Sequence, residues 1–305
     1  DWRAATYRNI LINAASSVAV NDTKDMGTTP IIVGAGTFAP GENITCGNLT
    51  VATGAGLTGN DDTLTVAGDF TTSGGLLGAS CLTLNGTSEK VTIPAHASLD
   101  FSTAFTLEGW IKLDGARVGD RNIVTKVGGY WWLAITDNVP KARFYDGANK
   151  DVVATTNVAD SKWHHIACTY DKTTFKIYVD GKLEGTNAQT ADVADSAAAA
   201  VAIGSDGSGT FLNGQIDEVR VWSVARTEAL IRADMFQGGT LSNSTGLQGR
   251  WKCDEGTGTT VANSGGSAGT AIDGVLNDAT AWAGAGTFTY GTSTLTFSGS
   301  TNHII

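Results

Sequence analysis

Proline, charge and long apolar runs are all scarce in this chain. Only 4 of its 305 residues are proline and 16% are charged, whereas 39 are glycine. Abundant glycine with many threonines, alanines and valines is typical of short strands joined by turns, and it argues against a helical protein. No apolar run approaches the length of a membrane span, and the first residues lack the pattern of a signal peptide. We therefore predict no membrane span, while cleavage before Asp1 stays compatible with the sequence.

Basic residues are the scarcer of the two charge types. The chain has 20 Lys and Arg against 30 Asp and Glu, a net charge of −10. Phosphate binding needs clustered basic side chains, so the composition argues against a nucleic-acid partner. Divalent cations and neutral glycans remain compatible partners.

The four cysteines are far apart and show no C-x-x-C spacing; they are Cys46, Cys81, Cys168 and Cys253. Cys168 shares a predicted strand face with Ile166 and Tyr170, where a small buried apolar residue fits well. Two alternatives stay open: buried thiols, which we favour, and two disulfides. The cellular compartment is therefore not fixed by cysteine usage.

A β-hairpin is the clearest local prediction, within residues 162–185. Phe175, Ile177 and Val179 alternate with Lys176, Tyr178 and Asp180, so the two sets face opposite sides of a strand. Asp180-Gly181 then supplies two residues that tolerate the positive φ of a tight turn.

Similar strand motifs precede and follow this hairpin in a fixed order. They are Leu82–Gly86 with Val91, Phe105–Trp110, Ile123–Lys126, Trp163–Asp171, Tyr178–Lys182, Ile203–Gly204 and Gly214–Trp222. As an ordered set they resemble the laminin-G-like, pentraxin-like branch of the concanavalin A-type lectin and glucanase jelly rolls. The resemblance implies an all-β, two-sheet antiparallel jelly-roll sandwich. It leaves function open, because this fold carries lectins, adhesion modules, glucanases and structural spacers.

An internal repeat brackets the predicted sandwich. Residues 34–38, Gly-Ala-Gly-Thr-Phe, recur at 284–288, and a shorter Leu-Thr pattern begins at Leu49, Leu64, Leu82 and Leu295. The spacing of the first three is close to one rung of a β-solenoid or one hairpin of a meander. The alternative is chance similarity in a chain rich in glycine and threonine. We predict that the jelly roll is inserted in, or attached to, a smaller repetitive β-domain resembling phage or bacterial surface fibres.

The predicted organisation has four parts: an N-terminal arm at 1–30, a repetitive β-segment at 31–79, the jelly roll at 80–240, and a C-terminal β-segment at 241–305 that can pack with 31–79. The arm either docks on a neighbour or, as we favour, packs on its own domain. Residues 298–305 resemble the start of another rung, from a chain once longer or, as we favour, paired with another subunit.

One helix is predicted near the end of the jelly roll. Thr227 can cap it, Glu228 suits its first turn, and Gly238-Gly239 ends it. The following segment, Gly246–Gly266, resembles a strand and turn that precede the core in the related jelly rolls. Its position after the core implies a rearranged strand order or the start of a further module.

Hydrolytic chemistry is not predicted. A retaining glycosidase needs two carboxyl groups on one face, and the E-x-D-x-x-E strand of the related glucanases is absent. Asp217 and Glu218 are adjacent, so alternation assigns them to opposite faces. The consecutive His164 and His165 are split in the same way, one packed and one solvated, which argues against a metal pair. We therefore expect no catalytic residues.

Calcium is the expected metal, as a structural ion. The resemblance implies two positions: Asp206 after Ile203-Gly204, and Asp217 together with the loop at Asn85. Calcium takes roughly six to eight oxygen ligands, which such loops provide. The competing interpretation is that Asp206 forms a turn and Asp217 is an ordinary strand-end residue.

Aromatic side chains are the candidate glycan ligands. Trp131 and Trp132 are consecutive, so one indole is expected in the core and one outside, with Tyr145 on an adjacent run. An exposed indole can stack on the apolar face of a sugar. The alternative is that both indoles pack in the sandwich or at a subunit contact.

Taken together, the sequence predicts a non-enzymatic structural or adhesion component of a virion or cell surface, a fibre, decoration or appendage subunit that associates with itself or with other surface subunits. The alternative is a secreted carbohydrate-binding module or lectin, and a glycoside hydrolase is the disfavoured third. Both favoured readings place the protein outside the cell or on a virion.

Overall fold

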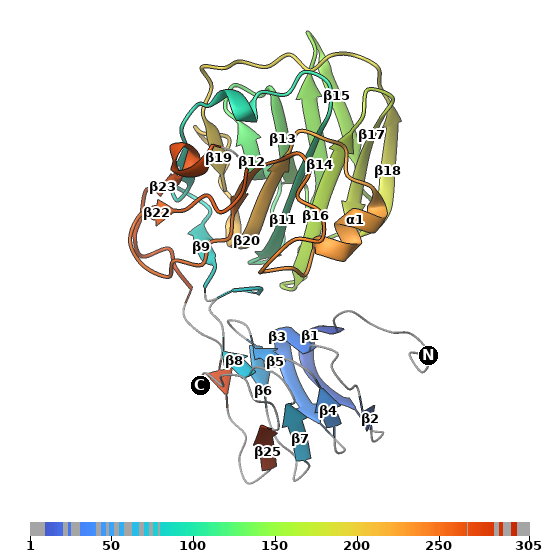
Figure 1. Cartoon of the computed structure of the whole chain (residues 1–305), viewed down its shortest axis with the longest axis vertical. Coiled ribbons are helices and arrows are strands. Elements are labelled where there is room, and N and C mark those ends of the chain that lie inside the picture. The colour runs from blue at the N-terminus through green and yellow to red at the C-terminus, as the bar shows by residue number, and fades with distance from the viewer. Residues whose placement is uncertain are drawn as a thin grey trace. The chain divides into compact units, whose positions relative to one another are not determined.

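The computed structural model describes residues 80–266 and 268–283 continuously, and in the rest of the chain residues 76–78 and a set of short strands. Two compact units divide the chain (Figure 1). The flanking unit comprises Asp1–Ser80 and Ala283–Ile305, and the sandwich unit comprises Cys81–Trp282. The described residues contain no helix long and apolar enough to cross a membrane.

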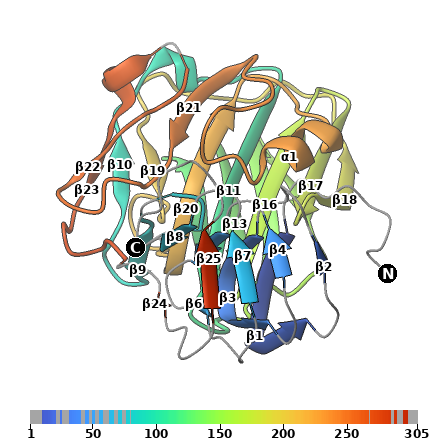
Figure 2. The same ribbon diagram turned by 60° about the horizontal axis from the view of Figure 1, so that its bottom comes forward.

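The flanking unit consists of parallel strands in two sheets. One sheet has the order β24-β6-β3-β5-β8 with β1 beside β3, and the other has the order β2-β4-β7-β25. Figure 2 shows β4, β7 and β25 side by side. The strands are β1 (Ile10–Val20), β2 (Lys24–Asp25), β3 (Ile31–Pro40), β4 (Ile44–Cys46), β5 (Leu49–Val51), β6 (Ala55–Leu57), β7 (Thr63–Val66), β8 (Phe70–Thr72), β24 (Thr287–Phe288) and β25 (Thr294–Phe297). All these pairings are parallel, and the chain passes repeatedly from one sheet to the other, with β5 and β6 both paired with β3 in the first sheet. This is the arrangement of a β-solenoid.

The sandwich unit is inserted in this solenoid. Thr287 on β24 pairs with Gly56, which pairs with Thr37, so the Thr-Phe ends of the two repeated segments share one column of rungs. Leu295 likewise pairs with Leu64, across more than two hundred intervening residues. The predicted fold class, an antiparallel jelly roll inserted in a smaller repetitive β-domain, is confirmed.

Two details of the predicted repeat differ from the structure, whereas the described part of the arm packs on its own unit, as the favoured alternative predicts. The Leu-Thr segment at Leu82 belongs to the sandwich, and the one at Leu49 lies in the other sheet from Leu64. Within the predicted arm, β1 pairs with β3 of its own unit. Residues 1–9 and the terminal 298–305 lie outside the described residues, so the predicted extra rung stays a prediction.

The sandwich unit has an eight-stranded and a seven-stranded antiparallel sheet. The first has the order β15-β14-β13-β12-β19-β10-β23-β22, and the second β18-β17-β16-β11-β20-β21 with β9 beside β20. The eight strands are β10 (Val91–Ile93), β12 (Asp120–Lys126), β13 (Trp131–Thr136), β14 (Val139–Tyr145), β15 (Asn149–Val153), β19 (Val201–Ile203), β22 (Thr260–Val261) and β23 (Gly274–Leu276). The seven are β9 (Leu82–Asn85), β11 (Phe105–Leu113), β16 (Trp163–Tyr170), β17 (Thr174–Val179), β18 (Lys182–Ala188), β20 (Asn213–Trp222) and β21 (Leu247–Trp251).

Alternation builds the core between these sheets. Phe175, Ile177 and Val179 of β17 are buried there, as the hairpin pattern predicts. Asp180 and Gly181 have φ values of 51° and 73°, the positive pair that a two-residue type I′ turn requires. The helix α1 (Glu228–Asp234) is capped by the Thr227 side chain and packs on the outer face of the seven-stranded sheet, with Ile231 against Ala167 and Tyr178. Short 3₁₀ turns η1 (Ala97–Leu99) and η2 (Gly269–Ile272) complete the unit.

The sandwich extends further along the chain than the predicted boundary at 240. Strand β21 pairs with β20, β22 and β23 join the eight-stranded sheet, and Trp251 is fully buried in the core. The C-terminal segment predicted at 241–305 is therefore divided, with residues up to Trp282 in the sandwich unit and the remainder in the flanking unit. Gly238-Gly239 after α1 suggest a domain boundary. The chain nevertheless continues in the sandwich, because packing against the core buries the large apolar surface of Trp251. Of the two alternatives for Gly246–Gly266, the structure shows the rearranged strand order.

Candidate functional site

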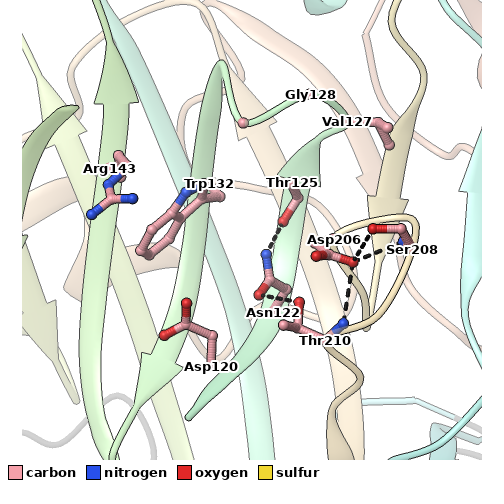
Figure 3. Close-up of a pocket in the computed structure, with 11 residues that line it drawn as sticks. Asp120, Asn122, Thr125, Val127, Gly128, Trp132, Arg143, Asp206, Ser208 and Thr210 are labelled. Carbon is pink, nitrogen blue, oxygen red and sulfur yellow. Dashed lines mark hydrogen bonds between the residues drawn. The ribbon is translucent and has the colours of Figure 1, made fainter. Parts of the chain in front are cut away.

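The two consecutive tryptophans of β13 lie on opposite faces of the eight-stranded sheet. Trp131 is fully buried in the core, with its ring centroid 5.5 Å from that of Phe101. Its Nε1 donates a hydrogen bond to Asp195 Oδ2 at 3.0 Å. Trp132 points outward and lines a groove on the outer face of the sheet (Figure 3). Trp131 is thus a packing residue, and Trp132 is the indole available to a site.

The groove consists of two hollows that share Gly128, Gly129, Trp132 and Arg143. The first has a volume of about 300 Å³ and is lined further by Asp120, Asn122, Thr125, Val127, Asp206, Ser208 and Thr210. The second has a volume of about 410 Å³ and is lined further by Tyr130, Tyr145 and Asn149. Both volumes fall within the range of small-ligand sites, roughly 300–1,000 Å³. Strands β12, β13 and β14 form the floor, and the turn before β13 and the loop after β19 form the walls.

Arg143 covers one part of the Trp132 ring. The two residues are direct partners across β13 and β14, and the guanidinium carbon lies 5.0 Å from the indole centroid. Arg143 is held in turn by Asp151, through Nε to Oδ1 at 2.5 Å and Nη2 to Oδ2 at 2.7 Å. These hydrogen bonds raise the pKa of Arg143 and, against the opposing effect of burial, lower the pKa of Asp151. Lys141 Nζ also lies 5.8 Å from the indole centroid, and Trp132 is only 7% exposed.

Hydrogen bonds fix the polar wall of the first hollow. The amides of Ser208, Gly209 and Thr210 all donate to Asp206 Oδ1, at 2.8, 2.7 and 3.2 Å. Burial raises the pKa of Asp206, but these backbone hydrogen bonds outweigh it, so the pKa lies below its usual value and the side chain is a carboxylate. Thr210 Oγ1 also donates to Asn122 Oδ1 at 3.1 Å, which ties the loop after β19 to β12.

The residues of the two predicted calcium positions, Asp206 at one and Asp217 with the Asn85 loop at the other, lie in different surroundings. Asp206 lies in the groove wall, Asp217 is fully buried on β20, and Asn85 ends β9. Asn85 Oδ1 accepts hydrogen bonds from the Thr87 and Ser88 amides and the Thr87 hydroxyl, so its lone pairs already serve its own loop. Within the part of the chain that the structure describes, no group of three or more acidic, histidine or cysteine side chains could hold a metal. This geometry offers calcium no ready site from these residues, and the calcium prediction itself stays untested.

The carboxylates of β20 correct one step of the sequence reasoning. The pairing of β11 with β20 shifts between Glu108 and Trp110, and Glu218 has φ of +52°. This bulge turns Asp217 and Glu218 toward the same face, where Asp217 is opposite Trp110 and Glu218 meets Arg220 and Arg250. Both carboxylates are nonetheless buried, 0% and 2% exposed, and so do not face a cleft.

A comparison with family models finds a similarity within the sandwich unit. The family model described as the concanavalin A-like lectin/glucanases superfamily matches residues 85–232, so this part of the chain is similar to that superfamily. None of the curated proteins matches the chain.

Among solved structures, the fold is similar to that of a candidate carbohydrate-binding protein from Bacteroides ovatus, at 22% identity and a TM-score of 0.52. At this identity the match shows the fold alone. It covers 65% of this chain and 59% of the other protein, so this chain spans less than two thirds of that protein's length. A weaker likeness is to domain 4 of an extracellular arabinanase from Geobacillus stearothermophilus, solved with arabinotriose. It has 21% identity and a TM-score of 0.43, and covers 52% of this chain and 76% of that domain.

Sequence reasoning identified part of this groove. Trp132 and Tyr145 were candidate glycan ligands and line it, whereas Trp131 does not. Asp206 was a candidate metal ligand and lies in the same groove. Asp120, Asn122 and Arg143 were missed, because their convergence depends on the register of three strands. Only the repeated charge on β14, at Lys141 and Arg143 with one residue between them, signals a solvent-facing strand surface there.

Proposed function

We propose that the sandwich unit is a glycan-binding module, carried on the solenoid of a non-enzymatic protein at a cell or virion surface. The observation that carries this proposal is the outward Trp132 between two hollows. Sugars are bound by aromatic rings, which contact their C–H faces, and by fixed amides and carboxylates, which bind their hydroxyls. The groove offers Tyr130, Tyr145 and the small exposed part of Trp132 for the first task, and Asn122 and Asp206 for the second.

The electrostatics of the chain fit this role better than the main alternatives. A net charge of −10 disfavours nucleic acid and anionic membranes as partners. The buried pairing of Glu218 with Arg250, at 2.8 Å between Oε1 and Nη2, argues against general acid or base work by that carboxylate. Non-enzymatic status is part of the proposal, and hydrolysis of a bound β-glucan would refute it.

Binding to an array of glycans, with the full chain as probe, tests the proposal. We expect selective binding that is lost in Trp132→Ala and weakened about tenfold in Tyr145→Ala. Leu183→Ala is the matched control, because Leu183 is 37% exposed and Tyr145 39%, and Leu183 lies on the other sheet. Thermal melts must show that Trp132→Ala remains folded. Binding that all three variants retain would contradict the proposal.

A structural or assembly role is the second candidate, and the solenoid favours it. Parallel rungs end in strand edges that can pair with another chain. Sedimentation of the purified chain without any glycan distinguishes the two: ordered oligomers or filaments support assembly as the main role, whereas a monomer that binds glycan supports the module.

A further inference from the structure

The two hollows are neighbours, and together they decide how much ligand the groove can hold. They share Trp132 and Arg143, and they share the glycine pair 128–129 as one wall. A single sugar would fill one hollow and leave the other hydrated. A chain of sugars would use both and would cross above Trp132 and the Arg143 side chain that covers part of it.

The hollows differ in chemistry. The first is lined mainly by polar side chains, namely Asp120, Asn122, Thr125, Asp206, Ser208 and Thr210. The second is lined by the rings of Tyr130, Trp132 and Tyr145. A pyranose or furanose ring has a hydroxyl edge and an apolar face, so one hollow suits the edge of one sugar and the other suits the face of the next.

Charge selects among glycans. Two carboxylates, Asp120 and Asp206, line the first hollow, and Arg143 is the one cation among the residues that line either hollow. Arg143 shares Asp151 with Lys141, whose Nζ lies 2.9 Å from Asp151 Oδ2, so these three side chains keep one positive charge against the two carboxylates of the first hollow. A uronate or sialate in the first hollow would therefore meet more negative than positive charge, whereas an uncharged sugar meets acceptors for its hydroxyls.

The polar wall is preorganised. Asp206 fixes its loop through three backbone amides, and Asn122 joins β12 to that loop through Thr210 while donating to Thr125 Oγ1 at 2.5 Å. Figure 3 shows these bonds along one side of the groove. Because the loop is already fixed in the free protein, binding a glycan costs little conformational entropy there, and less of the contact energy with each sugar is lost.

From these observations we infer that the groove binds two or more consecutive uncharged sugars of a glycan chain, one in each hollow across Trp132, rather than a single terminal or acidic sugar. The inference rests on the proposed function and specifies its ligand class.

Affinity electrophoresis of the full chain, followed by calorimetry, tests it. The gels contain uncharged polymers (amylose, mixed-linkage β-glucan, xylan, arabinan, mannan) or acidic ones (alginate, polygalacturonate, hyaluronate). The polymer that retards the protein most then supplies a series from monosaccharide to hexasaccharide. We expect an uncharged polymer to be selected, and Kd to fall at least about tenfold between the monosaccharide and the trisaccharide.

Tyr145→Ala should remove most of that gain, and Leu183→Ala should leave it intact. Monosaccharide affinity equal to that of the trisaccharide would overturn the inference, as would selection of an acidic polymer. So would a length dependence that Tyr145→Ala leaves intact. Absence of retardation by every polymer would instead remove the proposed function itself, and the inference with it.

Discussion

Leu82 and Trp282 form an isolated antiparallel bridge where the sandwich unit begins and ends. Beside it, the Thr83 amide donates to the Ala281 carbonyl at 2.7 Å. The two ends of a domain of about two hundred residues are thereby held together. The insertion therefore costs the solenoid little loop-closure entropy, because a folded domain with adjacent ends, rather than a long flexible loop, connects its two segments.

This closure predicts that residues 80–283 fold alone. We expect the fragment to unfold in one cooperative thermal transition, followed by near-ultraviolet circular dichroism. A fragment ending at 240, the boundary that the sequence suggested, should lack fixed tertiary structure because it omits β21 and the buried Trp251. Equal melting temperatures for the two fragments would show that β21–β23 do not belong to the cooperative unit.

Removing Arg250 should destabilise the sandwich strongly. Arg250 donates to both oxygens of Glu218, at 2.9 and 2.8 Å, and both side chains are buried. Arg250→Met leaves a buried carboxylate short of a cation, and we expect a loss of about 3–5 kcal/mol in the free energy of unfolding. Glu218→Gln in the same chain should restore part of it in urea titrations. A double variant whose loss equals the sum of the single losses would contradict this coupling.

His164 should make stability depend on pH. Its Nδ1 lies 2.9 Å from Asp180 Oδ2 and its Nε2 lies 3.1 Å from Asp160 Oδ1, so both ring nitrogens face carboxylates. Burial lowers the pKa of His164, but these two partners outweigh it and the net shift is upward. Lys162, 3.1 Å from Asp160, is the nearby cation. The sequence predicted one solvated and one packed histidine, yet both are buried, His164 at 9% and His165 at 1% exposed.

The sign follows from the raised pKa in the folded state. The stabilisation is complete below the unfolded value of about 6.5 and is lost as pH rises through the folded value. Urea titrations of wild type and His164→Gln between about pH 5 and 9 should therefore show a difference that shrinks with rising pH. Burial and the charge of Arg220 lower the pKa of His165 to about 3, so His165 also makes stability depend on pH below about 6.5, but it does so in both proteins and cancels in their difference. A difference that grows with pH would refute the assignment.

Gly204 positions the wall of the groove. Its φ is +78°, and a Cβ there would come within 2.3 Å of Leu84 Cδ1. Gly204→Ala should cost about 1–3 kcal/mol in stability and weaken glycan binding by displacing Asp206. Gly209→Ala is the control, because a Cβ at Gly209 meets nothing within 4 Å. Calorimetry and thermal melts on both variants check this. Equal effects of the two would show that the wall tolerates displacement.

The sandwich was predictable where the pattern was local. Alternation along β17 and the Asp180-Gly181 turn determine the hairpin whatever surrounds it. The bulge at Glu218 was not predictable, because it depends on Gly109 lying opposite on β11, a contact between distant segments. The same applies to β21, whose place beside β20 follows from the burial of Trp251 after an intervening helix.

The groove shows the same limit. That Trp131 and Trp132 face opposite sides follows from the period of a strand. That Arg143 covers Trp132, and that Asp120 and Asp206 meet on one wall, follows only from the order β14-β13-β12-β19 of the sheet. The repeat in the sequence indicated a solenoid, but it did not show that the strands are divided between two sheets. The same Leu-Thr motif occurs at Leu49 in one sheet and at Leu64 in the other.

The central claim is that the outer face of β12, β13 and β14 binds glycan. The most direct test is the amide ¹⁵N–¹H spectrum of the full chain, recorded with increasing amounts of the oligosaccharide that binds best. Shifts should concentrate at the groove walls, in residues 127–132, 143–149 and 206–210. Shifts confined to the seven-stranded sheet, or to the loop at 85–89, would contradict the account.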